Sequence, residues 1–101
     1  MVSLFALYRR PEDEEAFLSY YRDVHVPLAS RMPGLAEIQW GKQELIGSED
    51  PSDPWFVVAE MRFKDRASLM AAVTSEQGKA AAEDTKYFAE GLLTMRVVEW
   101  E

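Results

Sequence analysis

The sequence contains no cysteine and only one histidine in 101 residues. The lack of cysteine excludes a disulfide framework, a thiolate nucleophile and a cysteine-ligated metal site. One histidine with scattered carboxylates is too small a set for a typical tetrahedral zinc site within one chain. No phosphate-binding loop or dinucleotide fingerprint is present either. We therefore expect no metal and no other cofactor, and a protein of the reducing cytoplasm.

Basic residues are also few. Lysine and arginine number 11 against 18 aspartates and glutamates, which gives a formal net charge of −7. Such a surface repels phosphate backbones and anionic membranes, so we expect neither nucleic acid nor membrane as a partner. No apolar run approaches the roughly 20 residues of a membrane span. The apolar start of the chain has no basic segment before it, so it is interpreted as a strand and not as a signal peptide.

Alternating apolar residues and turn formers predict one domain over residues 1–101 with the order strand, helix, strand, strand, helix, strand. The expected strands cover residues 2–8, 35–46, 55–63 and 93–100, and the expected helix starts are Asp13, Asp65 and Thr74. Pro27 should kink or end the first helix, Gly41 is a possible bulge in the second strand, and residues 47–54 form a polar loop. This order is that of an α+β, ferredoxin-like βαββαβ sandwich.

The predicted strands are apolar on both faces. In the third strand, Val57 and Ala59 lie on one face, and Phe56 and Val58 lie on the other, which turns polar only at Glu60. Helices cover one face of such a sheet, so the second apolar face needs another cover. We therefore predict a symmetric homodimer that buries the sheet face opposite the helices.

His25 is the only side chain that normally titrates near neutral pH. A helical wheel with 3.6 residues per turn makes Phe17, Tyr21, Val24 and Leu28 the core stripe of the first helix and places His25 at its edge. A histidine at a helix end often packs or forms a local hydrogen bond. That structural role stands beside the catalytic one.

Asp84 falls in the middle of an apolar stripe with Ala81 and Phe88. Aspartate is almost never buried without a partner, so this residue either has a structural hydrogen bond or lines a polar pocket. If Asp84 meets His25 across the two helices, the carboxylate orients the imidazole as in an acid/base pair. We then expect the pKa of His25 in the folded protein to lie above its unfolded value.

Aromatic side chains supply the candidate ligand contacts. We assign Tyr20, Tyr21, Trp55 and Phe88 to ligand binding, and Tyr20 or Tyr21 would donate a hydrogen bond to a ligand oxygen. Aromatic residues are more often core than ligand contacts, so packing is the alternative for each.

The segment FLSYYRDVHVPL, from Phe17 to Leu28, followed by Pro33-Gly34-Leu35, resembles the first signature of the EthD family, named for a protein of an ethyl tert-butyl ether degradation system. The second half is similar to the same family at Ala59-Glu60-Met61-Arg62-Phe63 and at the later positions Ser75, Gly78, Ala82, Asp84 and Phe88. The resemblance covers nearly the whole chain.

The resemblance implies a dimeric α/β barrel, and it implies that His25 and Asp84 are family positions. It does not imply one reaction, because similar barrels include muconolactone isomerases, polyketide cyclases, dye-decolourising peroxidases and small haem-degrading monooxygenases. The leading hypothesis is binding of a small, largely apolar organic molecule between sheet and helices, with acid/base chemistry by His25 and Asp84. The family is often grouped with oxidoreductases. The alternatives are a non-catalytic binding or accessory protein and a haem-binding monooxygenase with His25 as axial ligand.

Overall fold

The computed structural model spans residues 1–101 and describes residues 1–47 and 52–101. Its elements in chain order are β1 (Val2–Arg9), α1 (Glu14–Tyr20), the π-helical turn η1 (Tyr21–His25), α2 (Val26–Ala29), β2 (Leu35–Lys42), β3 (Trp55–Phe63), α3 (Arg66–Thr74), α4 (Glu76–Phe88) and β4 (Leu93–Glu99). Residues 48–51 of the predicted polar loop lie outside the described residues. Among the described helices, none is long and apolar enough to cross a membrane.

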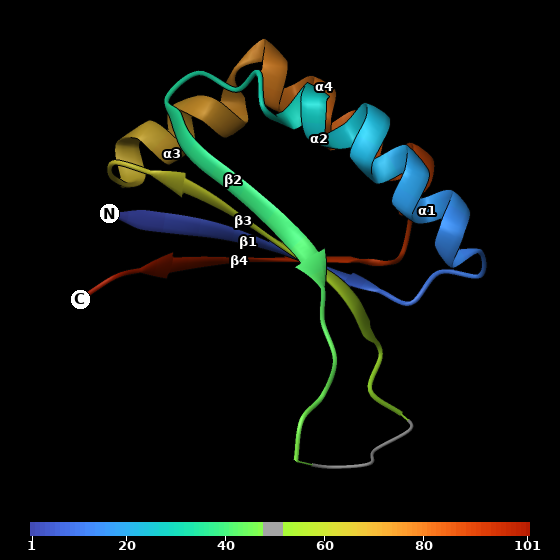
Figure 1. Ribbon diagram of the computed structural model, residues 1–101. Coiled ribbons are helices and arrows are strands. Elements are labelled where there is room, and N and C mark those ends of the chain that lie inside the picture. Colours follow the sequence, from blue (N-terminus) through green and yellow to red (C-terminus); the bar gives the residue numbers. More distant parts are fainter. Residues whose placement is uncertain (48–51) are drawn as a thin grey trace.

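The four strands form one antiparallel sheet in the order β2-β3-β1-β4. All described helices lie on one side of this sheet (Figure 1). The predicted α+β, ferredoxin-like fold is therefore confirmed. The core lies between the two layers. Alternate residues of the central strands are buried there, with Leu4, Ala6 and Tyr8 on β1 beside Val57 and Ala59 on β3.

A register shift at the edge of this sheet reverses the faces of two aromatic residues. The pairing of β1 with β3 runs regularly to Tyr8 and Val57 and then continues at Arg9 and Trp55, so Phe56 has no partner of its own. One extra residue moves the following side chain to the opposite face. Phe56, predicted for the open face, is buried against the ring of Phe17.

Strand β2 differs from its prediction in length and in the place of its irregularity. It ends at Lys42 and not at residue 46, because Lys42 and Val57 form its last pair with β3. The predicted bulge at Gly41 is wrong, since Gly41 pairs regularly with Val58 and the shift lies between Leu35 and Glu37.

The elements α1, η1 and α2 follow one another without a break and form the first helix of the chain. Its middle part, η1, is a π-helical turn that the helical wheel did not anticipate. The backbone N–H of Val26 donates to the carbonyl of Tyr21, five residues earlier. This wider turn aligns residues four apart, so the buried stripe is Phe17, Tyr21, His25 and Ala29, while Val24, predicted for the core, is exposed. Asp13 caps the helix as predicted, with its carboxylate accepting from the N–H of Ala16.

Pro27 does not end this helix, which continues to Ala29. Proline lies in the first turn of α2, where its missing N–H does least harm, directly after the π-helical turn. The irregularity expected at this proline therefore takes the form of a changed hydrogen-bond ladder just before it.

The two later helices meet at a tight corner. Asp65 caps α3 as predicted, but α4 is capped by Ser75 and not by Thr74: the Ser75 hydroxyl accepts from the N–H of Gly78 at 3.0 Å. A Cβ on Gly78 would stand 2.2 Å from the carbonyl oxygen of Ala72 in α3. Only glycine permits this approach of α4 to the end of α3.

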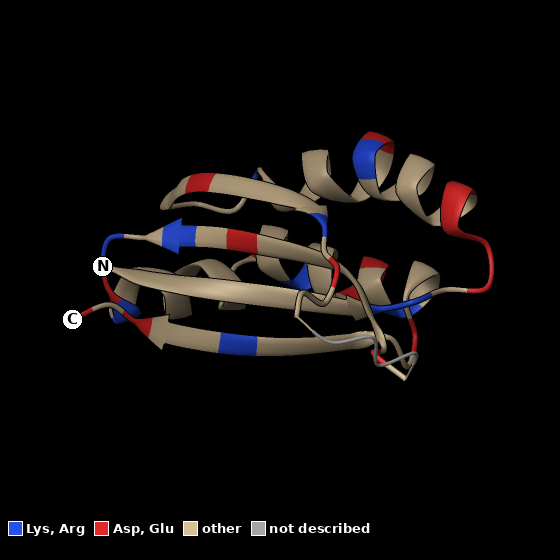
Figure 2. Cartoon of the chain, turned by 60° about the horizontal axis from the view of Figure 1, so that its bottom comes forward, with Lys and Arg blue, Asp and Glu red and all other residues tan. Residues whose placement is uncertain are grey.

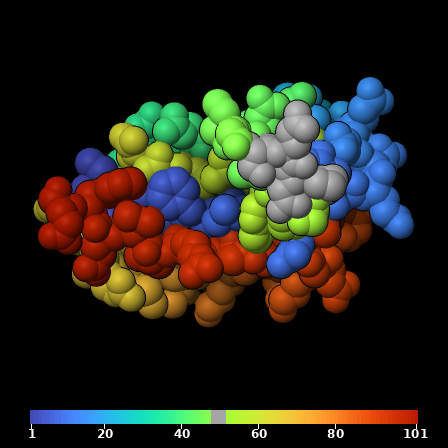
Figure 3. All heavy atoms as spheres, turned by 90° about the horizontal axis from the view of Figure 1, so that it is seen from below, coloured from blue at the N-terminus to red at the C-terminus, as the bar shows by residue number. Residues whose placement is uncertain are grey.

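The sheet face opposite the helices is open. Atoms of β1, β3 and β4 reach the surface there (Figure 3), and the strands carry both charges and apolar positions (Figure 2). The register places Phe5, Leu7 and Val58 on this face, and Arg62 on the same face forms ion pairs with Glu37 and Glu60. Trp100 donates from Nε1 to the hydroxyl of Ser3 at 2.7 Å, and that hydroxyl donates to Glu60 at 2.6 Å. The Trp100 ring also makes an edge contact with Phe5 while remaining half exposed.

Candidate functional site

His25 and Asp84 meet between the first helix and α4. The imidazole Nδ1 lies 2.9 Å from the Asp84 carboxylate, and both side chains are largely buried. The π-helical turn places His25 on the inner face of its helix, and the helical stripe of α4 brings Asp84 opposite. Because the carboxylate accepts, Nδ1 carries the proton and Nε2 is left with a lone pair.

Further side chains hold this pair in place. The hydroxyl of Tyr20 donates to the second carboxylate oxygen of Asp84 at 2.5 Å. This hydrogen bond is the main cause that raises the pKa of Tyr20 to about 12. Phe88 packs against the imidazole with ring centroids 4.7 Å apart, and the Tyr21 ring stacks with the imidazole at a centroid distance of 5.4 Å. The imidazole therefore has one hydrogen-bonded nitrogen and a fixed ring plane.

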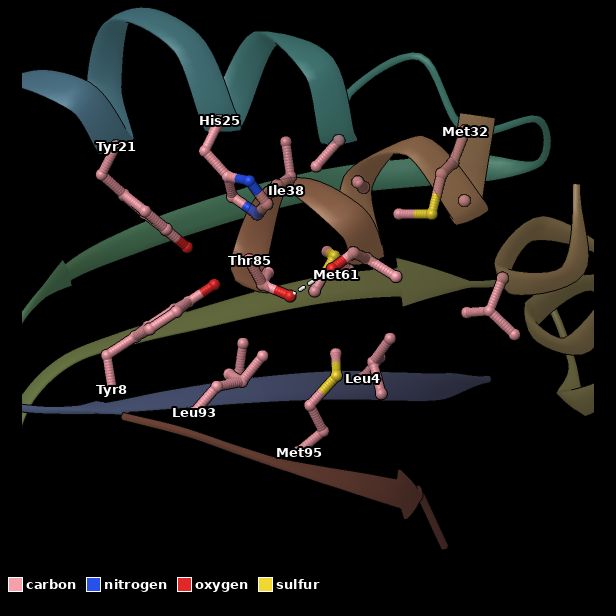
Figure 4. Close-up of a pocket in the computed structure, with 16 residues that line it drawn as sticks. Leu4, Tyr8, Tyr21, His25, Met32, Ile38, Met61, Thr85, Leu93 and Met95 are labelled. Atoms are coloured by element: carbon pink, nitrogen blue, oxygen red, sulfur yellow. Dashed lines mark hydrogen bonds between the residues drawn. The ribbon is translucent and has the colours of Figure 1, made fainter. Parts of the chain in front are cut away.

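A cavity of about 140 Å³ lies beside the imidazole, between the sheet and the helices (Figure 4). Most of its lining is apolar, and three methionines, Met32, Met61 and Met95, form part of the wall. Two of the lining residues, Ala82 on α4 and Met95 on β4, are exposed to solvent. The cavity therefore opens between α4 and the edge strand β4.

The cavity exists because α4 turns small side chains toward the sheet. Gly78, Ala81, Ala82 and Thr85 supply the helix side of the lining. A helix of this kind normally fills the space above a sheet with leucine or isoleucine, and close packing would then leave no void. The small residues give up that packing and leave room for a ligand.

The polar groups of the cavity gather at one end. Tyr8 from β1 and Tyr21 from the first helix extend toward each other beside His25 (Figure 4). Burial raises the pKa of both phenols, that of Tyr21 to about 12, while the hydrogen-bonding influence of Tyr8 acts to lower the pKa of Tyr21. Both phenols are therefore protonated at neutral pH.

Burial lowers the pKa of His25 below its ordinary value, and the nearby Asp84 offsets this only in part. The expected rise in the His25 pKa is therefore wrong in its net direction, because loss of hydration at this position outweighs the attraction of one carboxylate. The imidazole is neutral at pH 7 and its Nε2 is free to accept a proton.

The six predicted site residues divide into three groups. His25 and Tyr21 line the cavity, while Asp84, Tyr20 and Phe88 stand behind the imidazole and support it. Trp55 does not line the cavity. It pairs with Arg9 beyond the register shift, with the Arg9 guanidinium 5.1 Å from the centre of its ring.

Sequence reasoning missed Tyr8 and Thr85 as cavity residues. The signal for Tyr8 was present, because alternation along β1 places it on the same face as Leu4 and Ala6. Thr85 follows Asp84 directly and gave no separate signal. Among the described residues, no group of three or more histidine, aspartate and glutamate side chains could hold a metal ion.

Comparison with known proteins identifies relatives along the whole chain. The family model of the EthD domain matches residues 9–91. A Rhodococcus erythropolis protein, described as an uncharacterised 11.0 kDa protein in the thcB-thcC intergenic region, is 31% identical over 101 residues, which cover 100% of this chain and 96% of that protein.

Solved structures agree with this result. The crystal structure of an ethyl tert-butyl ether degradation (EthD) family protein from Bacillus halodurans is 36% identical, with a TM-score of 0.89 and coverage of 100% of this chain and 99% of that one. A hydroxynitrile lyase from Passiflora edulis shares the fold at 15% identity, with a TM-score of 0.72 over 99% of this chain and 94% of that one. More distant structures of the same fold are described as dimeric ferredoxin-like proteins. On the domain match and the two relatives above 30% identity, the chain belongs to the EthD family.

Proposed function

We propose that this protein binds a small, largely apolar organic molecule in the cavity and moves a proton from one atom of that molecule to another. The observation that carries the proposal is a buried, hydrogen-bonded His25–Asp84 pair whose imidazole lines a largely apolar cavity. Buried groups with a shifted pKa, as His25 has here, occur preferentially at functional sites. A purely structural role for the pair would not require a cavity beside it.

In this proposal His25 is the base. Its Nε2 accepts a proton from a carbon or oxygen of the ligand, and Asp84 stabilises the imidazolium that forms. Tyr20 acts through Asp84 as a positioning residue, and Phe88 fixes the plane of the ring. Returning the proton to another atom of the ligand gives an isomerisation. Attack of the resulting enolate on a second carbonyl of the same ligand gives a cyclisation, and neither reaction involves net oxidation.

The cavity does not fit a haem group. Apolar cavities of about 150 Å³ hold a molecule the size of benzene, and this one measures about 140 Å³. A tetrapyrrole is several times larger than benzene. The size and the apolar lining therefore favour a compact ligand over a haem-dependent oxidoreductase.

We also propose that the protein acts as a homodimer, in the cytoplasm and without nucleic acid or membrane partners. The open sheet face carries the partly buried apolar side chains of Phe5, Leu7 and Val58 beside the exposed Trp100. A second copy of the same face is the simplest cover for them. The dimeric descriptions of more distant structures with this fold support this arrangement.

Proton transfer is tested directly with cyclohexanone, whose ring is of cavity size. In D₂O, NMR measures the loss of its α-proton signals as they exchange for deuterium. We expect wild-type protein to accelerate the exchange, His25→Gln to abolish the acceleration, and Asp84→Asn to reduce it roughly ten-fold or more.

Glu83→Gln is the matched control, because Glu83 neighbours Asp84 in the chain but forms its ion pair with the exposed Lys86. Exchange that is unaffected by His25→Gln would contradict the assigned base. Saturable binding of cyclohexanone without accelerated exchange would identify a binding protein without turnover.

A further inference from the structure

We propose that the cavity selects a neutral, ring-sized compound bearing one hydroxyl group or enolisable carbonyl, and that Tyr21, positioned by Tyr8, recognises its oxygen. This inference rests on the proposed function, since it assigns a ligand class to the same cavity. It follows from hydrogen-bonding capacity, charge and size, considered in turn.

The hydrogen-bonding capacity of the polar end is one donor beside one acceptor. The hydroxyls of Tyr8 and Tyr21 point toward each other at this end of the cavity, beside His25 (Figure 4). Two neighbouring phenols share at most one hydrogen bond with each other, so at least one O–H stays available to a ligand. We assign that O–H to Tyr21, because its ring stacks with the ring of His25, whose Nε2 is the acceptor.

The acceptor is Nε2 of His25, whose Nδ1 proton is committed to Asp84. The Tyr21 and His25 rings are stacked with centroids 5.4 Å apart, and both residues line the same end of the cavity (Figure 4). A hydroxyl group satisfies both, because its oxygen accepts from Tyr21 and its proton goes to His25. A carbonyl with an adjacent C–H satisfies them in the same way.

Charge excludes anionic ligands. Of the described residues that line the cavity, none is lysine, arginine, aspartate or glutamate. His25 is neutral at pH 7, and the charged group hydrogen-bonded to it is the negative Asp84. A carboxylate or phosphate would therefore lose its hydration without gaining a countercharge.

Size limits the ligand to about one ring. The cavity of about 140 Å³ is close to the roughly 150 Å³ that accommodate benzene. The flexible side chains of Met32, Met61 and Met95 in its wall permit small differences in ring shape. Polar selectivity therefore comes from one end of the cavity, while the apolar part tolerates variation.

Three probes of matched ring size test the proposal: toluene, phenol and benzoate. NMR titration of the protein at pH 7 measures the dissociation constant of each. We expect phenol to bind roughly three- to ten-fold more tightly than toluene, as one added hydrogen bond allows, and benzoate to bind more weakly than toluene. Tyr21→Phe should bring phenol to the affinity of toluene and leave toluene unchanged. Tyr87→Phe, which removes the hydroxyl of an exposed tyrosine on α4, should alter neither.

The outcomes separate this proposal from the proposed function. Equal affinities for phenol and toluene, or benzoate binding as tightly as phenol, would overturn the ligand class and leave cavity binding intact. Ala81→Leu fills the cavity and should abolish binding of toluene and phenol alike. Binding that survives Ala81→Leu, or no binding of any probe, would overturn both proposals. The order of affinities in the wild-type protein decides the question even if Tyr21→Phe fails to fold.

Discussion

At the scale of single residues, His25 shows how burial and charge compete. Its pKa is lowered by the loss of hydration and raised by Asp84, and the first effect is the larger. A neutral imidazole beside a carboxylate can take up a proton and be stabilised after it has done so. If a stronger ion pair raised the pKa of the histidine well above 7, the imidazole would already be protonated and could not act as a base at neutral pH.

Removing the charge of Asp84 should lower the pKa of His25 further, because burial remains while the attraction is lost. Asp84→Asn keeps the shape and a hydrogen-bond acceptor for Nδ1. NMR titration follows the imidazole without ambiguity, since the chain has one histidine. Glu83→Gln should leave the titration unchanged. An unchanged or higher pKa in Asp84→Asn would show that the carboxylate does not act on the imidazole.

The same lowered pKa makes folding depend on pH. The unfolded chain binds a proton at His25 near pH 6.5, whereas the folded chain binds it only at lower pH. Above about pH 6.5 His25 is neutral in both states, and the free energy of unfolding does not depend on its titration. As the pH drops from there toward the folded pKa, the unfolded chain takes up the proton first, and the free energy of unfolding falls by at most about 1.4 kcal/mol per pH unit.

Urea unfolding at pH 7.5 and pH 5.5 measures this change in the free energy of unfolding. Most carboxylates titrate below this window, so His25→Gln should remove most of the slope. A slope of the same size in His25→Gln would assign it to other groups.

At the scale of elements, the strands were predictable to within a few residues because alternation and turn residues mark them directly. The faces of Phe56 and Trp55 were not, because a register shift depends on the partner strand and leaves no mark in the shifted segment. The inner face of the first helix was missed for a similar reason. A wheel drawn at 3.6 residues per turn favoured Val24, whereas the π-helical turn buries His25.

The cap of α4 provides a test at this scale. Thr74 has the sequence spacing of a capping box, but the Ser75 hydroxyl makes the hydrogen bond to Gly78, while Thr74 donates to the carbonyl of Met70 in its own helix. Ser75→Ala should lower the free energy of unfolding by about 0.5–2 kcal/mol, and Thr74→Ala by clearly less. Thermal and urea denaturation of the two variants measure the difference. A larger loss of unfolding free energy in Thr74→Ala than in Ser75→Ala would show that Thr74, and not Ser75, caps α4.

At the scale of the whole molecule, one chain does not cover the apolar side chains of the open sheet face.

The two-sided apolar strands could be read from the sequence, and so could the meeting of His25 with Asp84 on the two helices. A pocket between sheet and helices was expected from the family resemblance, but its lining could not be foreseen, because it results from Gly78 and Ala81 facing methionines of distant segments.

A charge on the open face should separate the proposed dimer. Leu7 lies on β1 opposite Val58 and Thr94, on the side without helices. We expect sedimentation equilibrium at micromolar concentration to show a dimer for the wild type and a monomer for Leu7→Glu, with circular dichroism unchanged. Val24→Glu is the control, since Val24 is an exposed apolar residue on the helical layer. A monomeric wild type, or a dimeric Leu7→Glu, would contradict the sheet-face interface.

The π-helical turn has a consequence for evolutionary comparison. Relative to an ordinary α-helix, such a turn accommodates an additional residue between the same two helical ends, so it behaves as a one-residue insertion in an alignment. In a relative with one residue fewer between the counterparts of Tyr21 and His25, α-helical hydrogen bonds alone would join the same two helical ends, and the two side chains would still share one face of the helix. The spacing between the tyrosine and the histidine would then be three residues instead of four. A comparison of relatives should therefore accept both spacings as the same arrangement.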